Sequence, residues 1–337
     1  MGNWGVALGT NNRYREKLAV LEEALQLVQP YKESHPALYS EILNNLGVSY
    51  SSLGLYKKAL ALYQESLRVK SVKGINGTEL SYAKTLWNLG NLYPKTGELE
   101  KALDCCEKAR EIIEKARGKN DYHYSEALRR LAIFYSNAQL YEQALDYALA
   151  SKENLWLTHE DNTPVRAGIL HTIGMIYEGM EQYEKAVAHY EQVQQLAEGF
   201  YGKKHWLYAY YTNSLANGYK HLKQFDKALS FSREALEIIA QVFGEDNPRY
   251  GDHLNDLASI YHGQKQYAIA DSLMQAALAN NYSTFGPRHR KRRLVTKNYG
   301  ILRDKQGDYL TAFQYYRESN AILHDEIERY FGIFNEA

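Results

Sequence analysis

Asparagine side chains recur in this sequence at nearly constant intervals. Asn45 and Asn88 are 43 residues apart, and Asn213 and Asn255 are 42 residues apart. A carboxamide carries both a hydrogen-bond donor and an acceptor, so it can pair with the N–H and C=O groups of an extended peptide without demanding one particular side chain. Two interpretations stay open: a row of peptide contacts, or side chains that are solvated or bond across neighbouring repeats.

The residue types and their spacing do not predict a catalytic or metal-binding site. Eleven histidines are present, but no H-E-x-x-H motif and no His/Cys pairing at zinc spacing occurs. His221 and His262 fall in different repeats and are predicted to be ordinary surface or groove residues. The only cysteines, Cys105 and Cys106, are adjacent, and no Gly-rich phosphate loop or nucleophile motif appears. We therefore expect no catalytic residue, no metal site, no cofactor and no enzymatic activity.

A cluster of basic residues, "RHRKRR", is the sharpest charge feature of the chain. One interpretation is a dock for an acidic partner, a neighbouring domain or phosphates. The other is a solvated helix start. Nucleic acid is disfavoured as a partner because no basic stripe continues along the other repeats. The residues of this candidate dock are Arg288, Arg290, Lys291, Arg292 and Arg293.

Composition limits the class of protein. Lysine and arginine number 40, as do aspartate and glutamate, so net charge gives no attraction to nucleic acid or anionic membrane. The content of 45% hydrophobic and 24% charged residues is typical of a folded chain. No leader or membrane-spanning run is evident. Adjacent cysteines rarely pair with each other, so we expect a reduced, cytoplasmic protein.

A tyrosine recurs with a period of 42 or 43 residues along the whole chain. So regular a period indicates a repeat array. The recurring position, here called the anchor, holds Tyr50, Tyr93, Tyr135, Tyr177, Tyr219 and Tyr261, and the same frame reaches Leu8 at one end and Arg303 at the other.

Each repeat has the internal pattern of two helices. A small residue stands three positions before the anchor, as at Gly47, and a large apolar residue stands four before it. These spacings place both on one helical face, and the small residue allows a neighbouring helix to approach closely. A short polar turn, with glycine at Gly54, Gly97 and Gly307, precedes a second apolar stripe. The unit is therefore predicted to be a helical hairpin. Pro94 should end or kink its helix early.

These residues resemble the tetratricopeptide repeat (TPR), in the 42-residue subtype of kinesin light chains. The resemblance implies an all-α fold, a right-handed superhelical solenoid of stacked antiparallel helical hairpins. It covers residues 1–337 as one array of about eight units. The expected units are 1–35 (truncated), 36–77, 78–120, 121–162, 163–204, 205–246, 247–286, and 287–337 with the last repeat and a C-terminal helix.

The resemblance also implies a binding surface, because in this family the first helices line a concave groove that binds extended peptides. Glu41, Glu126 and Asp252 stand where a chaperone-tail clamp would need cations, so that specificity is disfavoured. The matching groove positions are Asn44, Asn45, Asn88, Asn91, Arg129, Arg130, His171, Asn213, Asn217, Asn255 and Asn298.

We expect a non-catalytic scaffold that binds a protein or peptide partner in this groove. The alternative is a regulatory array that controls an effector enzyme at its C-terminal end. Glu326–Ala337 looks similar to the junction between repeats and a CHAT-type protease in one bacterial group. Neither end carries a convincing polar cap, so self-association through the ends is a third expectation.

Overall fold

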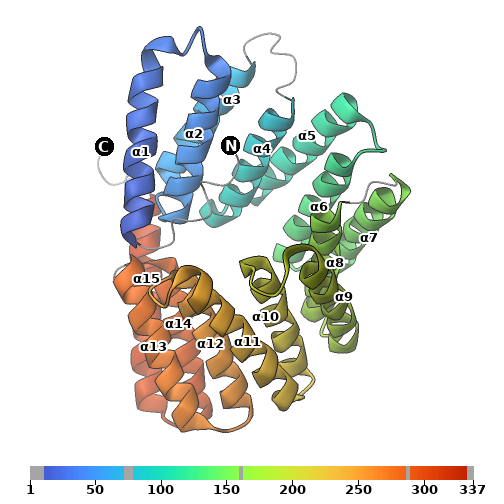
Figure 1. Cartoon of the computed structure of the whole chain (residues 1–337). Helices are drawn as coiled ribbons and strands as arrows, with labels where there is room; N and C mark the ends of the chain where they lie inside the picture. The colour runs from blue at the N-terminus through green and yellow to red at the C-terminus, as the bar shows by residue number, and fades with distance from the viewer. Residues whose placement is uncertain (1–10, 72–78, 159–161, 286–288, 332–337) are drawn as a thin grey trace. The chain divides into compact units, whose positions relative to one another are not determined.

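The computed structural model describes residues 11–71, 79–158, 162–285 and 289–331, and within them it contains helices and no strand (Figure 1). The α-helices are α1 Asn11–Val28, α2 Pro36–Ser52, α3 Tyr56–Ser71, α4 Glu79–Leu92, α5 Leu99–Arg117, α6 Tyr122–Asn137, α7 Tyr141–Leu157, α8 Thr163–Gly179, α9 Tyr183–Tyr201, α10 Trp206–His221, α11 Phe225–Phe243, α12 Pro248–Gly263, α13 Tyr267–Phe285, α14 Arg290–Lys305 and α15 Tyr309–Phe331. Two 3-10 helices are η1 Gln29–Tyr31 and η2 Tyr93–Thr96. The predicted all-α class is confirmed.

Contacts divide the chain into two compact units. The N-terminal unit is Arg15–His189, and the C-terminal unit is Tyr190–Ala337 together with Met1–Tyr14. In the N-terminal unit α2 packs on α3, α4 on α5 and α6 on α7; in the C-terminal unit α10 packs on α11, α12 on α13 and α14 on α15. Within each unit successive pairs stack on one another, for example α3 on α4 and α11 on α12. The predicted stack of helical hairpins is therefore confirmed within each unit.

A small residue on the first helix faces a large one on the second across the seam of a hairpin. A Cβ atom added at Gly47 would lie 2.5 Å from Cε1 of Tyr63, and one added at Gly300 would lie 2.8 Å from the ring of Tyr316. At Gly90 the facing atom is Sγ of Cys106, at 2.7 Å. The close approach predicted for the small position is thus real, and Cys106 is a buried core residue.

Several anchor tyrosines connect one hairpin to the preceding one through their hydroxyl groups. The hydroxyl of Tyr50 donates to Glu22, and that of Tyr219 donates to Glu191, in each case 28 residues earlier on a second helix. The rings themselves are buried. At these two positions a phenylalanine would fill the same space but would leave the carboxylate without this donor. At Tyr261 the hydroxyl instead accepts a hydrogen bond from Arg233, also 28 residues earlier.

Arg303 departs from this pattern, and Tyr299 compensates for it. Tyr299 is fully buried one turn earlier on α14, and its hydroxyl donates to Asp271, again 28 residues before. The guanidinium of Arg303 pairs with the same carboxylate and donates to the Tyr299 hydroxyl at 2.9 Å. The last hairpin thus keeps the tyrosine-to-carboxylate connection in a shifted register.

Pro94 has the predicted effect on its helix. α4 ends at Leu92, and the next four residues form η2 with Pro94 in its first turn. Proline has no N–H to bond to the carbonyl four residues before it, so the α-helical pattern stops there.

The turn inside each hairpin contains one residue with positive φ. Glycine occupies it at Gly54, Gly97 and Gly307, whereas Gln139, Glu181, Lys223 and Lys265 adopt the same conformation with φ between 59° and 63°. The left-handed region brings the Cβ atom of an L-residue close to the backbone, so these four side chains are held in a strained conformation.

Replacing Gln139 with glycine should therefore raise the free energy of unfolding by about 0.5–1 kcal/mol, because relief of strain exceeds the extra entropy of an unfolded glycine. Urea denaturation followed by circular dichroism measures this change. The matched control is Gly54→Gln, which should lower stability by a similar amount, since a Cβ at Gly54 meets no atom within 4 Å and only the backbone is affected. A destabilising Gln139→Gly would contradict the strain argument.

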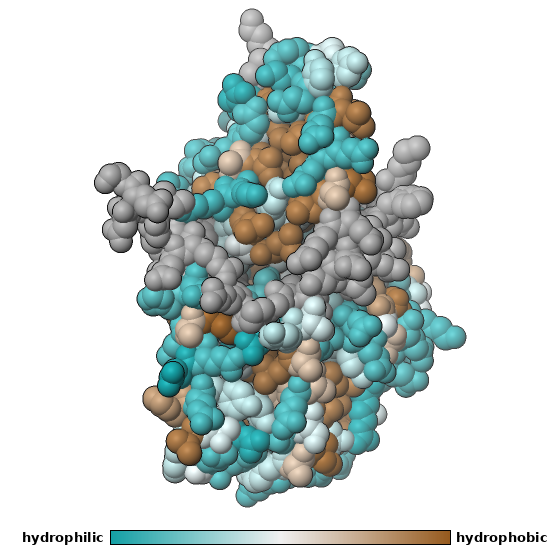
Figure 2. Space-filling view, turned by 90° about the vertical axis from the view of Figure 1, so that its left-hand side faces the viewer, coloured by the Kyte–Doolittle hydropathy of each residue, from teal (hydrophilic) through white to brown (hydrophobic). Residues whose placement is uncertain are grey.

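Apolar side chains are exposed on the helices that begin and end the described chain. α1 exposes Val20 and Leu27, and α15 exposes Tyr309, Leu310 and Phe313. Figure 2 shows apolar side chains gathered between polar ones on the N-terminal unit, on the face where α1 lies. Self-association through the ends stays a prediction. Leu8, the start of the repeat frame, lies outside the described residues. None of the described helices is long and apolar enough to cross a membrane.

Candidate functional site

The predicted groove asparagines of the N-terminal unit bond to each other across neighbouring first helices. Nδ2 of Asn88 on α4 donates to Oδ1 of Asn44 on α2 at 2.9 Å, and the hydroxyl of Thr85 donates to the same oxygen at 3.2 Å. Asn44 is buried, and Asn88 is partly exposed. Nζ of Lys70 donates to the Thr85 hydroxyl at 2.8 Å. The amides therefore hold α2 and α4 in register.

A longer amide row crosses three first helices of the C-terminal unit. Asn213 on α10 donates to the carboxylate of Asp256 on α12 at 2.6 Å, with Asn217 at 3.5 Å. Asn255 donates to Asp256 at 3.4 Å, and Asn298 on α14 donates to Oδ1 of Asn255 at 3.1 Å. Asn213 is buried, whereas Asn298 is exposed. Bonding across neighbouring repeats, one of the two interpretations of these residues, thus accounts for many of them.

The other predicted groove asparagines differ in accessibility. Asn91 is exposed at the end of α4, and Asn45 is partly buried on α2. Their role as partner contacts stays a prediction.

The predicted groove arginines share one carboxylate of the N-terminal unit. Arg129 donates to Glu126 at 2.6 and 2.7 Å, and Arg130 pairs with the same carboxylate at 3.1 Å. The guanidinium of Arg130 also lies 4.4 Å from the ring centre of Trp87. His171 is buried beside them; burial and the charge of Arg129 lower its pKa to about 4. These internal contacts indicate a structural role for the cluster.

The basic cluster before the last hairpin is partly paired within the chain. Nζ of Lys291 lies 2.6 Å from the carboxylate of Asp252, and Arg292 pairs with Glu318 while its guanidinium lies over the ring of Tyr282. Arg293 is partly buried. Arg288 lies outside the described residues, as does the side chain of Arg290. Docking of an acidic partner at this basic cluster stays a prediction. Fewer of the cluster's charges are available for it than the sequence indicates.

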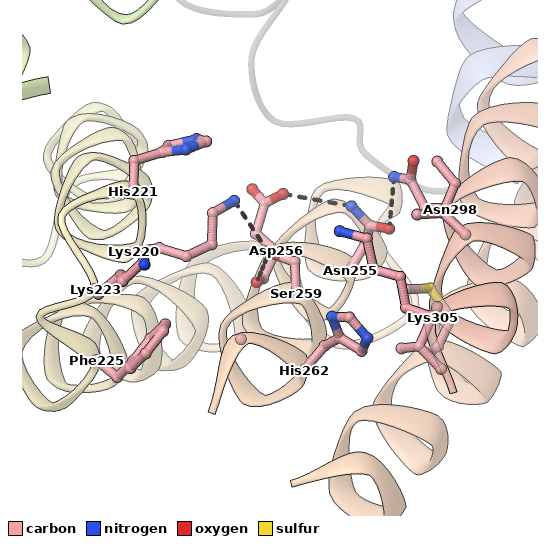
Figure 3. A pocket seen from close by; sticks show the side chains of 14 residues that line it. Lys220, His221, Lys223, Phe225, Asn255, Asp256, Ser259, His262, Asn298 and Lys305 are labelled. Atoms are coloured by element: carbon pink, nitrogen blue, oxygen red, sulfur yellow. Dashed lines mark hydrogen bonds between the residues drawn. The ribbon is translucent and has the colours of Figure 1, made fainter. Parts of the chain in front are cut away.

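A pocket of about 560 Å³ opens where α10, α12 and α14 end in the C-terminal unit (Figure 3). Its rim is basic, its wall carries the amide row, and its floor is apolar. The lining residues are Lys220, His221, Lys223, Phe225, Asn255, Asp256, Ser259, His262, Gly263, Met274, Asn298, Ile301, Leu302 and Lys305. The volume lies within the range of about 300–1,000 Å³ typical of sites for small ligands.

Positive charge dominates this pocket. Lys220, Lys223 and Lys305 oppose one carboxylate, that of Asp256, which gives a formal charge of +2 with neutral histidines. Nζ of Lys220 donates to Oδ1 of Asn217 at 3.1 Å and to the hydroxyl of Ser259 at 3.3 Å. Burial lowers the pKa of His262, and the charge of Lys305 lowers it further. The arrangement favours an anionic group.

The amides of this pocket were predicted from the sequence, whereas its cations were not. His221 and His262 were expected to be surface or groove residues in separate repeats; the structure places both on one pocket. Lys220, His262 and Lys305 each follow an anchor position by one or two residues. Comparison of the residues that follow the anchor position in each repeat would have revealed them.

Protein-family models match most of the chain. A model of the tetratricopeptide repeat matches residues 1–71, 81–154, 207–283 and 254–323, and a second model with the same description matches 167–200. The chain belongs to the tetratricopeptide-repeat family. Curated protein sequences give no match to this TPR protein.

Solved structures similar to this TPR protein share its fold at low identity. They include a kinesin-light-chain-like protein with TPR-like repeats from Podosopora anserina (19% identity, 60% of this chain and 96% of that one, TM-score 0.51). The Rap conjugation regulator of plasmid pLS20, in complex with the Phr* peptide, gives 16% identity, 89% and 79% coverage, and a TM-score of 0.67. A Rap protein complexed with Competence and Sporulation Factor gives 14% identity over 95% of this chain and 98% of that one, with a TM-score of 0.59.

The suggested link to a CHAT-type protease stays a hypothesis. It rests on the resemblance of Glu326–Ala337, of which residues 332–337 lie outside the described structure.

Proposed function

We propose that this TPR protein is a non-catalytic scaffold that binds an extended peptide segment across α10, α12 and α14. The observation that carries the proposal is one surface of the C-terminal unit on which a row of amides borders an open pocket. The amide row fixes the spacing of the helices, and its outer member, Asn298, keeps an exposed carboxamide. A backbone can bond to such a group whatever its side chains are.

Two features support a peptide over a folded partner. The pocket is open at the surface, and Asn255 and Asn298 lie along its side, as Figure 3 shows. Two similar TPR structures are complexes with a peptide or with Competence and Sporulation Factor, although their low identity extends only the fold to this chain. A peptide that is extended along the three helix ends would contact both the amides and the pocket.

The test is selection from a random peptide library, followed by fluorescence anisotropy with the selected peptides. The variant Asn255→Ala/Asn298→Ala should bind roughly 30-fold more weakly, since two hydrogen bonds are worth about 1 kcal/mol each. The matched control is Asn320→Ala, an exposed asparagine on the second helix α15, which should bind like the wild type.

Two outcomes would overturn the proposal: failure of the library to yield any binding peptide, or selected peptides that bind the double variant with unchanged affinity. Circular dichroism must show that the double variant keeps its helices.

A further inference from the structure

The pocket of the C-terminal unit has two cations for which the described part of the chain supplies no counter-ion. Lys223 ends the turn after α10, and Lys305 ends α14, on two sides of the pocket (Figure 3). Neither ammonium group has an ion-pair partner among the described residues. Both side chains are exposed at the rim, so a ligand can reach them without moving the backbone.

The one carboxylate of the pocket cannot serve these lysines. Asp256 accepts hydrogen bonds from Asn213 at 2.6 Å, from Asn255 at 3.4 Å and from Asn217 at 3.5 Å. Its oxygens are therefore directed toward the amide row. The excess positive charge at the rim is available to an anion from outside the chain.

An unsatisfied polar atom lies at the same place. Nε2 of His262 is buried and has no hydrogen-bond partner among the described residues, while its ring lies among the pocket residues in Figure 3. A buried polar atom without a partner is unfavourable by about 1–3 kcal/mol. A polar ligand group that displaces the neighbouring side chains would reduce this penalty.

The apolar floor of the pocket indicates which chemical group a ligand should carry next to its anion. Phe225, Met274 and Leu302 line it, so a ligand that fills the pocket must bury apolar surface as well as place a negative charge. A bare inorganic anion uses only the rim. A peptide that carries an acidic residue next to a large apolar residue uses the rim, the floor and the amide wall together.

The ends of the three helices argue against a phosphate group. α10, α12 and α14 all end at the pocket, so their carbonyl groups and the negative ends of their dipoles lie on this side. Phosphate sites typically use the opposite end, where backbone N–H groups point at the ligand. The same helix ends repel a singly charged carboxylate less than a doubly charged phosphate, so a carboxylate is the better match for the pocket lysines.

We propose that the pocket recognises an acidic residue, Asp or Glu, next to a large apolar residue in the bound peptide, with Lys223 and Lys305 as the charge-selecting residues. This inference rests on the proposed function and names the ligand chemistry of the same surface.

The test uses the whole chain and a positional-scanning peptide library with amidated C-termini, which removes the terminal carboxylate as a competing ligand. The selected peptides should carry Asp or Glu beside Leu, Ile, Phe or Met. Replacing the acidic residue by its amide should weaken binding roughly tenfold, and added salt should weaken the acidic peptide more than the amide peptide.

Charge reversal supplies the decisive comparison. Lys223→Glu/Lys305→Glu should lose the acidic peptide and gain affinity for the same peptide with lysine in place of the acidic residue. Glutamate is compatible with the positive φ at this turn, because Glu181 adopts it in another repeat. The control Lys57→Glu/Lys204→Glu makes the same change of charge at two exposed lysines outside the pocket and should keep the wild-type preference.

The outcomes separate this inference from the proposed function. Peptides that bind through Asn255 and Asn298 but show no charge preference would support the scaffold function. They would overturn the acidic-residue inference. Binding of inorganic phosphate that is lost on charge reversal, with no peptide selected, would overturn both in favour of a small anion. Absence of all binding would also overturn both.

Discussion

Lowering the pH from 6.5 to 4 should destabilise this TPR protein by about 3 kcal/mol through His171 alone. His171 is 6% exposed in the N-terminal unit, and burial together with the charge of Arg129 lowers its pKa from 6.5 to about 4. Between these values the unfolded chain binds a proton at this residue and the folded chain does not. Stability therefore falls as the pH falls through this window, by about 1.4 kcal/mol for each unit of pKa difference.

The measurement is the free energy of unfolding in urea at pH values from 4 to 7.5, for the wild type and for His171→Gln. Glutamine cannot take up the proton, so the slope of stability against pH should become smaller in the variant. The comparison of slopes is independent of any constant cost of the substitution. The control His324→Gln removes an exposed histidine on α15. Equal slopes in the wild type and His171→Gln would show that His171 is not held neutral by the fold.

The hairpins could be predicted because their core positions are local in sequence. A small residue, a large apolar residue and an anchor tyrosine within one turn specify a helical face, and the 42-residue period specifies that the faces repeat. Pro94 ended α4 as expected because its effect acts on the four preceding residues. The shift from the anchor to Tyr299 in the last hairpin was not visible, since it depends on Asp271, which is 28 residues earlier on another helix.

The candidate site was predicted only in part because its residues come from different repeats. The sequence indicates that asparagines such as Asn44 and Asn213 lie on one face of the first helices. It does not give the distance between successive first helices, and that distance decides whether an amide bonds to its neighbour or to a partner. Asn44 lies 2.9 Å from the amide nitrogen of Asn88, and Asn213 lies 2.6 Å from Asp256.

The pocket lysines were missed for a related reason. A lysine at a helix end is usually solvated, and it interacts favourably with the last carbonyl groups wherever it occurs. Lys220 and Lys305 are therefore unremarkable in sequence. Only the stacking of α10, α12 and α14 brings them to one pocket, where their charges add because Asp256 is the one carboxylate among the described lining residues.

Replacing Gly47 with alanine should lower the free energy of unfolding by about 1–2 kcal/mol, although alanine is the better helix former. The new Cβ atom would lie 2.5 Å from Cε1 and 2.7 Å from Cδ1 of Tyr63, a ring that is 2% exposed and packed in the core of the N-terminal unit. Overpacking of this kind costs about 1–3 kcal/mol, whereas the gain in helix propensity from glycine to alanine is at most about 1 kcal/mol.

The sign of this effect should reverse when the facing ring is removed. In the Tyr63→Ala background, which itself costs about 3–5 kcal/mol, Gly47→Ala meets no ring and should stabilise by up to about 1 kcal/mol. The chain already contains such a pairing, since Ala132 and Ala148 occupy the two corresponding positions of another repeat and both are fully buried. The coupling energy between the two sites should thus be about 2–3 kcal/mol.

Urea denaturation of the wild type, both single variants and the double variant measures the coupling. Gly199→Ala is the matched control, because a Cβ at this glycine of α9 meets no atom within 4 Å, so the substitution should stabilise in the wild-type background. Additive effects of Gly47→Ala and Tyr63→Ala would mean that the ring moves aside without cost. A coupling of the expected size would show that the ring of Tyr63 is the physical reason that position 47 is glycine and not alanine.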